Sequence, residues 1–322
     1  MAVVDPSRPV DYPLSVVYPV IDTHTHFDAP IFDEDREEQA RKGYAYGVRH
    51  LVLVGYLQAH FERLYEVQHA LAEMLPANDT PDSQVQAYVA LGLHPFYCEQ
   101  HTEAHLASMA QLLNERRPLA IGEIGLDTYT DAMKDPDMLA KQKHFFTAQL
   151  TMAVDHQLPV MLHIRKAHAE ALAVLKAHDY DAHQLGGIAH SFSGGEQEAK
   201  AFVKLGFKLG VTGQVTNPNA KKLRRTIKAV VERYGIECLV IETDCPDMTP
   251  IMCQTKRDDP SALGQSLDDE WRGLATHNRN VPAHLPWVLM SLSELLEIPV
   301  ALLAKQLWQN SCDALKTTWA YS

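Results

Sequence analysis

The chain has 322 residues, of which 46% are hydrophobic and 22% charged, a composition that is typical of a globular protein and allows a full hydrophobic core. Its formal net charge of -12 argues against a protein that coats nucleic acid with a broad basic face, although bound cations can still attract phosphate locally. No stretch of about 18 apolar residues predicts a membrane span.

The start of the chain and its cysteines indicate the cellular compartment. The first twenty residues lack the unbroken apolar segment of a signal peptide. Five cysteines, an odd number without a CxxC motif, disfavour a disulfide framework or a zinc knuckle. We therefore expect a reducing, cytoplasmic environment. Three prolines predict an irregular arm over residues 1–18, and one domain is expected over residues 19–322.

Eight short apolar segments have the composition of strands that are buried on both faces. They lie at residues 19–28, 48–55, 85–95, 119–127, 159–165, 187–195, 207–213 and 239–244. Helices are predicted after most of them, at about residues 59–75, 103–115, 138–156, 167–178, 196–205 and 219–234, and again from about residue 285 to the end.

This alternation predicts an α/β fold whose parallel strands are joined by right-handed crossovers. A count of eight strands favours a closed (β/α)8 TIM barrel over an open doubly wound sheet. No G-x-G-x-x-G or Walker loop supports a nucleotide-binding alternative. Residues 245–284 form a long polar connection with four prolines, which we expect to be a functional loop over the active-site face.

Side chains that bind metal ions stand where several of the predicted strands end. His24 and His26 are spaced i, i+2, which places both imidazoles on one face of a strand. Alone, this pair suits either a divalent metal ion or two unrelated polar positions. Since all strands of a barrel end at one face, a shared metal site is favoured by four further strand-end residues: Glu123, His163, His190 and Asp244.

Four imidazoles and two carboxylates are enough to hold two divalent cations. Such a pair of ions clamps a displacement at phosphorus or at a carbonyl carbon. The carboxylates bring about two negative charges against four positive ones, so the site stays cationic inside an acidic protein. Mg²⁺, Mn²⁺ and Zn²⁺ all remain candidates, because sites of histidine and carboxylate accept each of them.

Short motifs surround these residues along most of the chain. They are Asp22-Thr23-His24-Thr25-His26, Gly92-Leu93-His94-Pro95, Gly122-Glu123-Ile124-Gly125-Leu126-Asp127, His163-Ile164-Arg165, His190-Ser191-Phe192-Ser193-Gly194 and Glu242-Thr243-Asp244-Cys245-Pro246. Together they resemble the TatD family of metal-dependent hydrolases, within the amidohydrolase superfamily of barrels. The resemblance spans about residues 19–315.

The resemblance implies a role for each ligand. His24 and His26 would bind one metal ion together with Asp244, and Glu123 would bridge two ions. The second ion would be held by His163 and His190. The family is associated with Mg²⁺- or Mn²⁺-dependent DNase activity, largely exonucleolytic, and whether this chain acts as an endonuclease or an exonuclease stays open.

Three positions depart from the commonest pattern of the family. Thr25 and Ser191 stand where cysteine is frequent, and Cys245 stands where serine is frequent. None of them is an expected ligand, so the chemistry is unaffected. The connection over residues 245–284 is longer than usual and the arm over residues 1–18 is additional, which leaves substrate preference and oligomeric state open.

The expected reaction is the attack of a metal-bridging water on phosphorus. Asp244 would both bind metal and accept the proton, or act as a ligand alone with another base. Glu123 is the second residue expected to act in the chemistry. Glu242 shares a strand face with Asp244 and is expected to support a ligand or the inside of the barrel.

Four further residues are candidates for contact with the substrate. Arg165 shares a face with His163 and suits a phosphate, or alternatively a salt bridge. His94 is expected to contact the substrate or leaving group, or to make a structural hydrogen bond. Ser193 and Gly194 precede a predicted helix and either offer N–H groups to an anion or form a turn and cap. The basic cluster at residues 221–225 is expected to be a solvated helix face.

The sequence therefore predicts a divalent-metal-dependent phosphodiesterase, most simply a deoxyribonuclease that binds DNA locally at the metal site. The first alternative is a metal-dependent hydrolase of an ester, lactone or amide carbonyl. A second alternative is a barrel that serves as a non-catalytic interaction scaffold, which would have no chemical need for six ligands.

Overall fold

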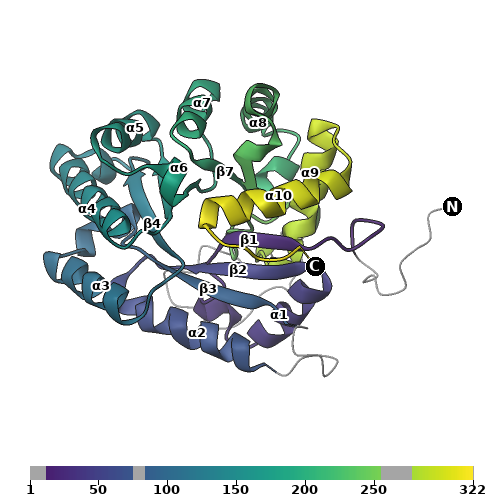
Figure 1. Cartoon of the computed structure of the whole chain (residues 1–322), viewed down its shortest axis with the longest axis horizontal. Helices are drawn as coiled ribbons and strands as arrows, with labels where there is room; N and C mark the ends of the chain where they lie inside the picture. The colour runs from purple at the N-terminus through teal and green to yellow at the C-terminus, as the bar shows by residue number, and fades with distance from the viewer. Residues whose placement is uncertain (1–11, 75–83, 255–277, 322) are drawn as a thin grey trace.

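The computed structural model describes residues 12–74, 84–254 and 278–321 and shows a closed (β/α)8 barrel (Figure 1). The fold prediction is confirmed. The eight strands are all parallel and are hydrogen-bonded in sequence order. They are β1 (Val20–Thr25), β2 (Val48–Val54), β3 (Gln86–Leu91), β4 (Ala120–Asp127), β5 (Val160–Arg165), β6 (Ile188–Ala189), β7 (Lys208–Val211) and β8 (Leu239–Ile241).

Helices connect the strands and form the outer layer. They are α1 (Arg36–Ala45), α2 (Phe61–Glu73), α3 (Glu103–Glu115), α4 (Pro136–Asp155), α5 (His168–Ala177), α6 (Ala182–Leu185), α7 (Glu196–Lys204), α8 (Lys221–Tyr234), α9 (Leu285–Leu296) and α10 (Val300–Leu315). Short 3-10 turns follow several strands, including η3 (Pro95–Gln100) after β3 and η5 (Gly213–Thr216) after β7.

The barrel closes where the segment after β8 meets the end of β1. The backbone N–H of Asp244 donates to the carbonyl of His24 at 2.9 Å, and the N–H of His26 donates to the carbonyl of Cys245 at 2.8 Å. The buried carboxylate of Asp22 accepts bonds from the backbone N–H of Thr243 at 2.8 Å and from its hydroxyl at 2.5 Å. These bonds fix the strand ends that carry the site.

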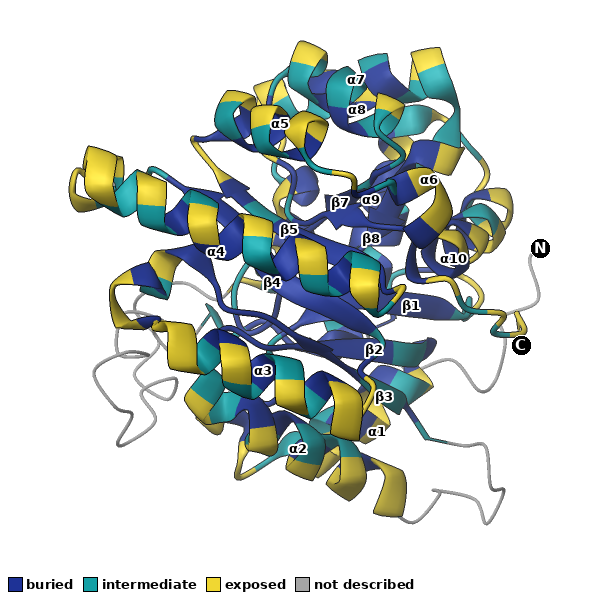
Figure 2. Ribbon diagram, turned by 60° about the vertical axis from the view of Figure 1, so that its left-hand side comes forward, coloured by how far each residue is buried: buried dark blue, intermediate teal, exposed yellow. Residues whose placement is uncertain are grey.

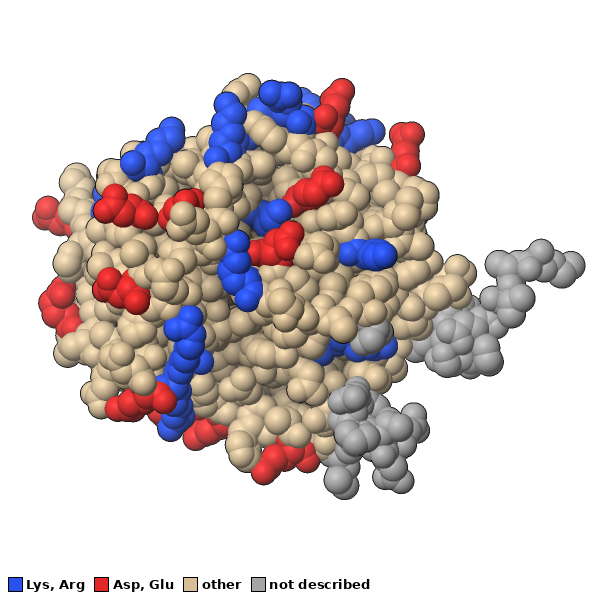
Figure 3. Space-filling model, in the orientation of Figure 1, with Lys and Arg blue, Asp and Glu red and all other residues tan. Residues whose placement is uncertain are grey.

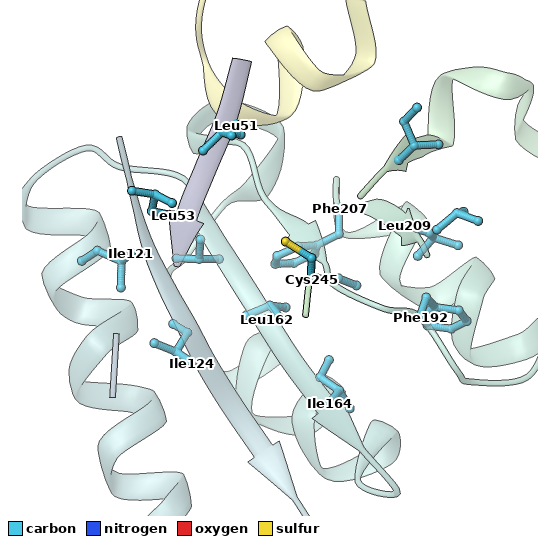
Figure 4. Packing of buried hydrophobic residues seen from close by; sticks show 14 of the residues in the cluster. Leu51, Leu53, Ile121, Ile124, Leu162, Ile164, Phe192, Phe207, Leu209 and Cys245 are labelled. Carbon is cyan, nitrogen blue, oxygen red and sulfur yellow. The ribbon is translucent and has the colours of Figure 1, made fainter. Parts of the chain in front are cut away.

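Alternating side chains divide the core into two layers. In β2, Val52 and Val54 belong to an inner cluster, whereas Leu51 and Leu53 belong to an outer cluster with the helices. This alternation follows from the period of two in a strand. Figure 4 shows part of the outer cluster, which includes Leu53 and Ile124. The strands are buried at the centre of Figure 2, while helices such as α2, α3 and α4 keep an exposed outer face.

Aromatic side chains fill the amino-terminal end of the barrel. The ring of His50 in β2 stacks on Trp319 at a centroid distance of 4.2 Å and an interplanar angle of 21°. Tyr88 in β3 lies 4.5 Å from the same indole. Trp308 in α10 donates its Nε1–H to the carbonyl of Trp319 at 2.9 Å. The segment after α10 thus seals this end of the barrel against solvent.

The surface carries charges of both signs. Figure 3 shows lysine, arginine and acidic residues intermingled on one face, with basic residues gathered at the upper edge over α7 and α8. The basic cluster lies on α8, where Lys221, Lys222 and Arg225 are exposed. Arg224 is the exception, because it donates to the carbonyl of Val215 at 2.5 Å.

Several boundaries differ from those that the sequence predicts. Helix α1 follows a charged segment that has little apolar periodicity, so no helix was expected there. Strand β6 has only two residues, because the chain turns after His190 and Ser191 adopts a positive φ of 41°. Of the expected arm, Tyr12 is buried against Tyr46, at a ring distance of 5.4 Å. Residues 1–11 and 255–277 lie outside the described part.

Among the described residues, no single helix combines the length and apolar composition needed to cross a membrane. In this part of the chain, only the two helical segments Pro282–Leu296 and Val300–Leu315 reach that length and composition, and they do so only when taken together. A bend of 114° separates them.

Candidate metal centre

The six residues that the sequence proposes as ligands come together at the carboxyl-terminal end of the barrel. Five of them line a cavity of about 530 Å³ that opens at the mouth: His26, Glu123, His163, His190 and Asp244. His24 is fully buried just beneath, with its Nε2 3.2 Å from Glu123 Oε2. The shared face of the strand ends explains this convergence.

Glu123 lies at the centre, and its two carboxylate oxygens face different partners. Oε2 is 3.2 Å from His24 Nε2 and 3.5 Å from His26 Nε2. Oε1 is 2.7 Å from His163 Nδ1, 3.3 Å from His94 Nε2 and 3.8 Å from His190 Nε2. One carboxylate therefore stands between two groups of imidazoles.

Asp244 also reaches both groups from the opposite side. Its Oδ1 lies 3.9 Å from the Nε2 atoms of His24 and His26, and its Oδ2 lies 3.4 Å from His190 Nε2. The residue has a positive φ of 55°, a conformation that is uncommon outside glycine and that clusters at functional sites. The backbone bond to His24 stabilises this conformation.

Three of the four histidines have their other ring nitrogen fixed by an oxygen. His26 Nδ1 is 3.0 Å from the carbonyl of Val54, and His163 Nε2 is 3.0 Å from Asp127 Oδ2. His190 Nδ1 is 2.9 Å from Glu242 Oε1, which is ion-pair distance without the geometry of a hydrogen bond. Metal-binding histidines are oriented in this way, because a bond at one nitrogen fixes the tautomer and points the other nitrogen at the ion.

The donor set fits divalent metal ions. His24 is 0% exposed, and within the described residues neither of its ring nitrogens has a hydrogen-bond partner. Leaving buried polar nitrogens unpaired is costly, and a metal ion would satisfy Nε2. The imidazoles of His24 and His190 stack at a centroid distance of 3.4 Å. A metal ion held by their Nε2 atoms and the carboxylates would stabilise this close stacking.

Local electrostatics keep the carboxylates charged. Burial raises the pKa of Glu123, but His94, His24 and His190 outweigh it and hold that pKa well below the usual range. Burial likewise raises the pKa of Asp244, and His190 outweighs it, so the net shift is downward. Both groups are thus anionic near neutral pH, as metal ligands must be.

The buried histidines titrate differently from one another. Burial, reinforced by His190, lowers the pKa of His24, and burial lowers the pKa of His94 to about 4. For His163, burial also opposes the charge, but Asp127 and Glu123 outweigh it and raise the pKa to about 8. His24 and His94 are therefore neutral imidazoles at pH 7.

Glycine makes room for the group that holds His190. An added Cβ at Gly210 in β7 would come within 2.2 Å of Glu242 Oε1. The carboxylate of Glu242, which also accepts the N–H of Ser191 at 2.5 Å, therefore needs the missing side chain. Any larger residue at position 210 would push Glu242 away from His190.

Two of the positions that depart from the family pattern contact each other. The hydroxyl of Thr25 lies 2.7 Å from the thiol of Cys245, across 220 residues of sequence. Both side chains are fully buried, so this contact lies beneath the site and joins its first and last strand ends.

Of the four residues predicted to contact the substrate, Arg165, His94 and Ser193 line the cavity and Gly194 does not. Arg165 lines the cavity, and its guanidinium lies 3.6 Å from the ring centroid of Tyr129. Across the described part of the chain, no carboxylate is within ion-pair distance of Arg165, which favours the substrate interpretation over a salt bridge. His94 Nε2 is 3.3 Å from Glu123 Oε1.

Ser193 lines the cavity, whereas Gly194 packs below it, where an added Cβ would come within 2.6 Å of the Phe192 ring. Glu198 of α7 accepts the N–H of Gly195. This acidic cap occupies the donor that an anion would use, so the structure favours the turn-and-cap alternative at that position.

Sequence reasoning missed several residues at the mouth. Asp127 ends β4 and contacts His163, and its place four residues after Glu123 in the same strand was an available signal. Three aromatic residues also line the cavity: Tyr56, Phe96 and Tyr97. Nothing in their spacing marks them, since they lie on short irregular segments after β2 and β3.

The chain matches known proteins over most of its length. A family model described as TatD related DNase matches residues 21–316. The metal-dependent hydrolase YjjV of Escherichia coli K12 is 35% identical over 268 residues, covering 77% of this chain and 94% of the relative. The 3'-5' ssDNA/RNA exonuclease TatD of Cronobacter sakazakii is 31% identical over 249 residues, covering 75% of this chain and 86% of the relative.

Solved structures give the same result. The crystal structure of YjjV from Escherichia coli superimposes with a TM-score of 0.74 at 30% identity, covering 94% of this chain and 100% of that one. A TatD family hydrolase from Entamoeba histolytica has a TM-score of 0.72 at 21% identity, covering 93% and 98% of the two chains, and supports the fold alone.

Proposed function

The chain belongs to the TatD related DNase family of metal-dependent hydrolases, and on this premise we propose that it is a divalent-metal-dependent phosphodiesterase that cleaves single-stranded nucleic acid. The observation that carries the proposal is the position of Glu123, whose two oxygens face two separate groups of histidines. The relatives named as 3'-5' ssDNA/RNA exonucleases support this substrate class.

We propose that the site holds two divalent ions. His24, His26, Glu123 Oε2 and Asp244 Oδ1 would hold one, and Glu123 Oε1, His163 Nδ1 and His190 Nε2 would hold the other. When bound, such ions polarise a phosphoryl oxygen and lower the pKa of coordinated water towards neutrality. Four imidazoles favour Mn²⁺ or Zn²⁺ by ligand softness, whereas the family association favours Mg²⁺.

The protein side chains would place and move the protons. Asp244 is anionic and lies at the floor of the open cavity, so it is suited to accept a proton from the attacking water. Asp127 would hold His163 in the tautomer whose Nδ1 lone pair faces the centre. Glu242 would do the same for His190.

His94 is suited to donate a hydrogen bond to the substrate. Its Nδ1 accepts the backbone N–H of Phe96 at 3.0 Å, so in the neutral ring the proton is on Nε2, which faces the centre. A donor at that position would stabilise a phosphate oxygen or the leaving group. Arg165, which also lines the cavity, would bind a second phosphate oxygen.

The cysteines support the proposed location in a reducing cytoplasm. Four of the five cysteines are buried and form no disulfide: Cys98, Cys238, Cys245 and Cys312. Burial raises the pKa of the thiols of Cys98, Cys238, Cys245 and Cys312, which keeps them protonated and unreactive.

A substrate panel tests the function. The protein is reconstituted with Mg²⁺, Mn²⁺ or Zn²⁺ in separate reactions and is incubated with single-stranded DNA, RNA, a phosphodiester reporter, and a set of esters and lactones. We expect metal-dependent cleavage of the phosphodiesters, abolished by chelator and restored by metal. Turnover confined to esters or lactones would instead support the carbonyl hydrolase, and absence of both metal binding and turnover would support the interaction scaffold.

A further inference from the structure

A series of aromatic rings leads from the proposed metal centre to the mouth of the cavity. It begins at His26, whose ring is 5.6 Å from Tyr56 in an edge-to-face arrangement at 88°. Tyr56 lies 5.4 Å from Tyr97, and Tyr97 lies 5.4 Å from Phe96, again edge to face at 83°. We call Tyr56, Tyr97 and Phe96 the aromatic wall.

Phe96 is the outermost ring of this wall, and it is unusually exposed for a phenylalanine. Its side chain is 40% exposed although it lines the cavity. Leaving a large apolar ring in water forgoes the free energy that burial would provide. Because the ring borders the cavity, a flat apolar group of a ligand would cover it there.

The backbone fixes Phe96 relative to the proposed chemistry. Its N–H donates to His94 Nδ1, and His94 Nε2 is 3.3 Å from Glu123 Oε1. Phe96 lies in the 3-10 turn η3, which begins at Pro95, and the proline ring restricts the backbone at that point. The Phe96 ring is thus carried by a short rigid turn directly after the motif that ends at Pro95, and not by a free loop.

From these contacts we propose that Phe96 is a stacking platform for a nucleobase of the nucleotide next to the scissile phosphate. The inference rests on the proposed phosphodiesterase function and adds a binding subsite to it. Tyr97 supports the ring from its edge, and the cationic centre and Arg165 receive the phosphates. Base stacking on aromatic rings tolerates any sequence, because every base has a flat π-face.

This subsite also gives a physical reason for a preference for single strands. Inside a duplex, both faces of each base are covered by neighbouring base pairs, so a base can stack on Phe96 only after it has left the helix. Unstacking has an energetic cost that a single-stranded end largely avoids. The aromatic wall therefore selects strands whose end is already unpaired.

Trinucleotides with an abasic residue test the proposal. The steady-state kinetics of wild type, Phe96→Ala and Phe96→Trp are measured on a single-stranded DNA trinucleotide and on three versions in which one position in turn lacks its base. We expect Phe96→Ala to lower kcat/KM by about tenfold on the intact trinucleotide, mainly through KM. Phe96→Trp should retain most of the wild-type value.

The distinguishing result is the loss of this effect on one abasic substrate. When the abasic position flanks the cleaved bond on the stacking side, wild type and Phe96→Ala should be equal. Equal losses on all four substrates, or no loss on the intact one, would overturn the subsite. Leu302→Ala, at an exposed apolar residue of α10, is the matched control, and thermal unfolding confirms that each variant folds.

Failure of the subsite and failure of the function give different results. If wild type cleaves the trinucleotide but Phe96→Ala behaves as wild type, the function stands and the subsite is wrong. If wild type cleaves no phosphodiester with any metal, the function itself is wrong and the subsite falls with it.

Discussion

At the amino-terminal end of the barrel His50 stacks on Trp319 at 4.2 Å, whereas at the carboxyl-terminal end His24 stacks on His190 at 3.4 Å. The ring of His50 lies against Tyr88, Trp308 and Trp319, and its Nδ1 is 3.4 Å from the Tyr88 hydroxyl. The ring of His24 has no hydrogen-bond partner in the described residues and faces two carboxylates.

The two ends show that the role of a histidine inside the barrel is defined by what surrounds its nitrogens. Aromatic neighbours make His50 a packing residue that is part of the seal. Carboxylates and other imidazoles make His24 a candidate ligand. Because packing and metal binding depend on different contacts, substitutions at the two ends should separate stability from activity.

The largest expected effect comes from Glu123→Gln. Removing the central charge should lower phosphodiester cleavage by about 10²–10³-fold or more, because both proposed ions lose a ligand. The amide has nearly the same shape, so the unfolding midpoint of the metal-free protein should stay within about 3 °C of wild type. Glu232→Gln, on the exposed face of α8, is the matched control and should leave both quantities unchanged. Retained turnover in Glu123→Gln would contradict the bridging role.

A smaller loss is expected from Gly210→Ala. The new Cβ would collide with Glu242 and displace the carboxylate that holds His190, which should lower metal affinity or activity by about 10- to 100-fold. Gly43→Ala is the matched control, since its Cβ would come no closer than 3.3 Å to Pro282. If Gly210→Ala binds metal as tightly as wild type, Glu242 does not position His190.

At the sealed end, His50→Ala should change stability but not turnover. Loss of the stacking contacts with Trp319 and Tyr88 should lower the free energy of unfolding by about 1–2 kcal/mol. Chemical denaturation measures this, and kcat on single-stranded DNA should remain that of wild type. A fall in kcat without a fall in stability would mean that the two ends are coupled.

A pH dependence of stability is also expected at the same residue. Burial, with a contribution from Arg49, lowers the pKa of His50 from 6.5 to about 4. Between these values the unfolded chain binds the proton and the folded chain does not, so stability falls as pH drops from 6.5 to 4. His50→Gln should therefore lose less stability than wild type over this window, as judged by thermal unfolding at matched salt. Parallel curves would show that His50 is not the group responsible.

Much of this arrangement could be predicted from the sequence, because barrel strands end at one face. That rule alone brings His24, Glu123, His163, His190 and Asp244 together, although up to 220 residues separate them. The strands themselves can be recognised in the sequence for a different reason: strands that are buried on both faces are apolar throughout.

The rest depends on contacts that a single sequence does not encode in its spacing. The contact between Thr25 and Cys245 is visible only once β1 meets the segment after β8. The exposure of Phe96 depends on the path of η3, and the seal at Trp319 depends on how the chain returns after α10. Helix α1 was missed because its stability comes from packing and not from apolar periodicity.

Metal stoichiometry tests the central claim most directly. Metal-free wild type and Glu123→Gln are titrated with Mn²⁺ by calorimetry, and bound metal per chain is verified by elemental analysis. If Glu123 joins two halves of one site, wild type should bind two ions per chain, and Glu123→Gln should bind fewer or bind both much more weakly. Saturation of wild type at a single ion, or unchanged binding of two ions by Glu123→Gln, would contradict the account.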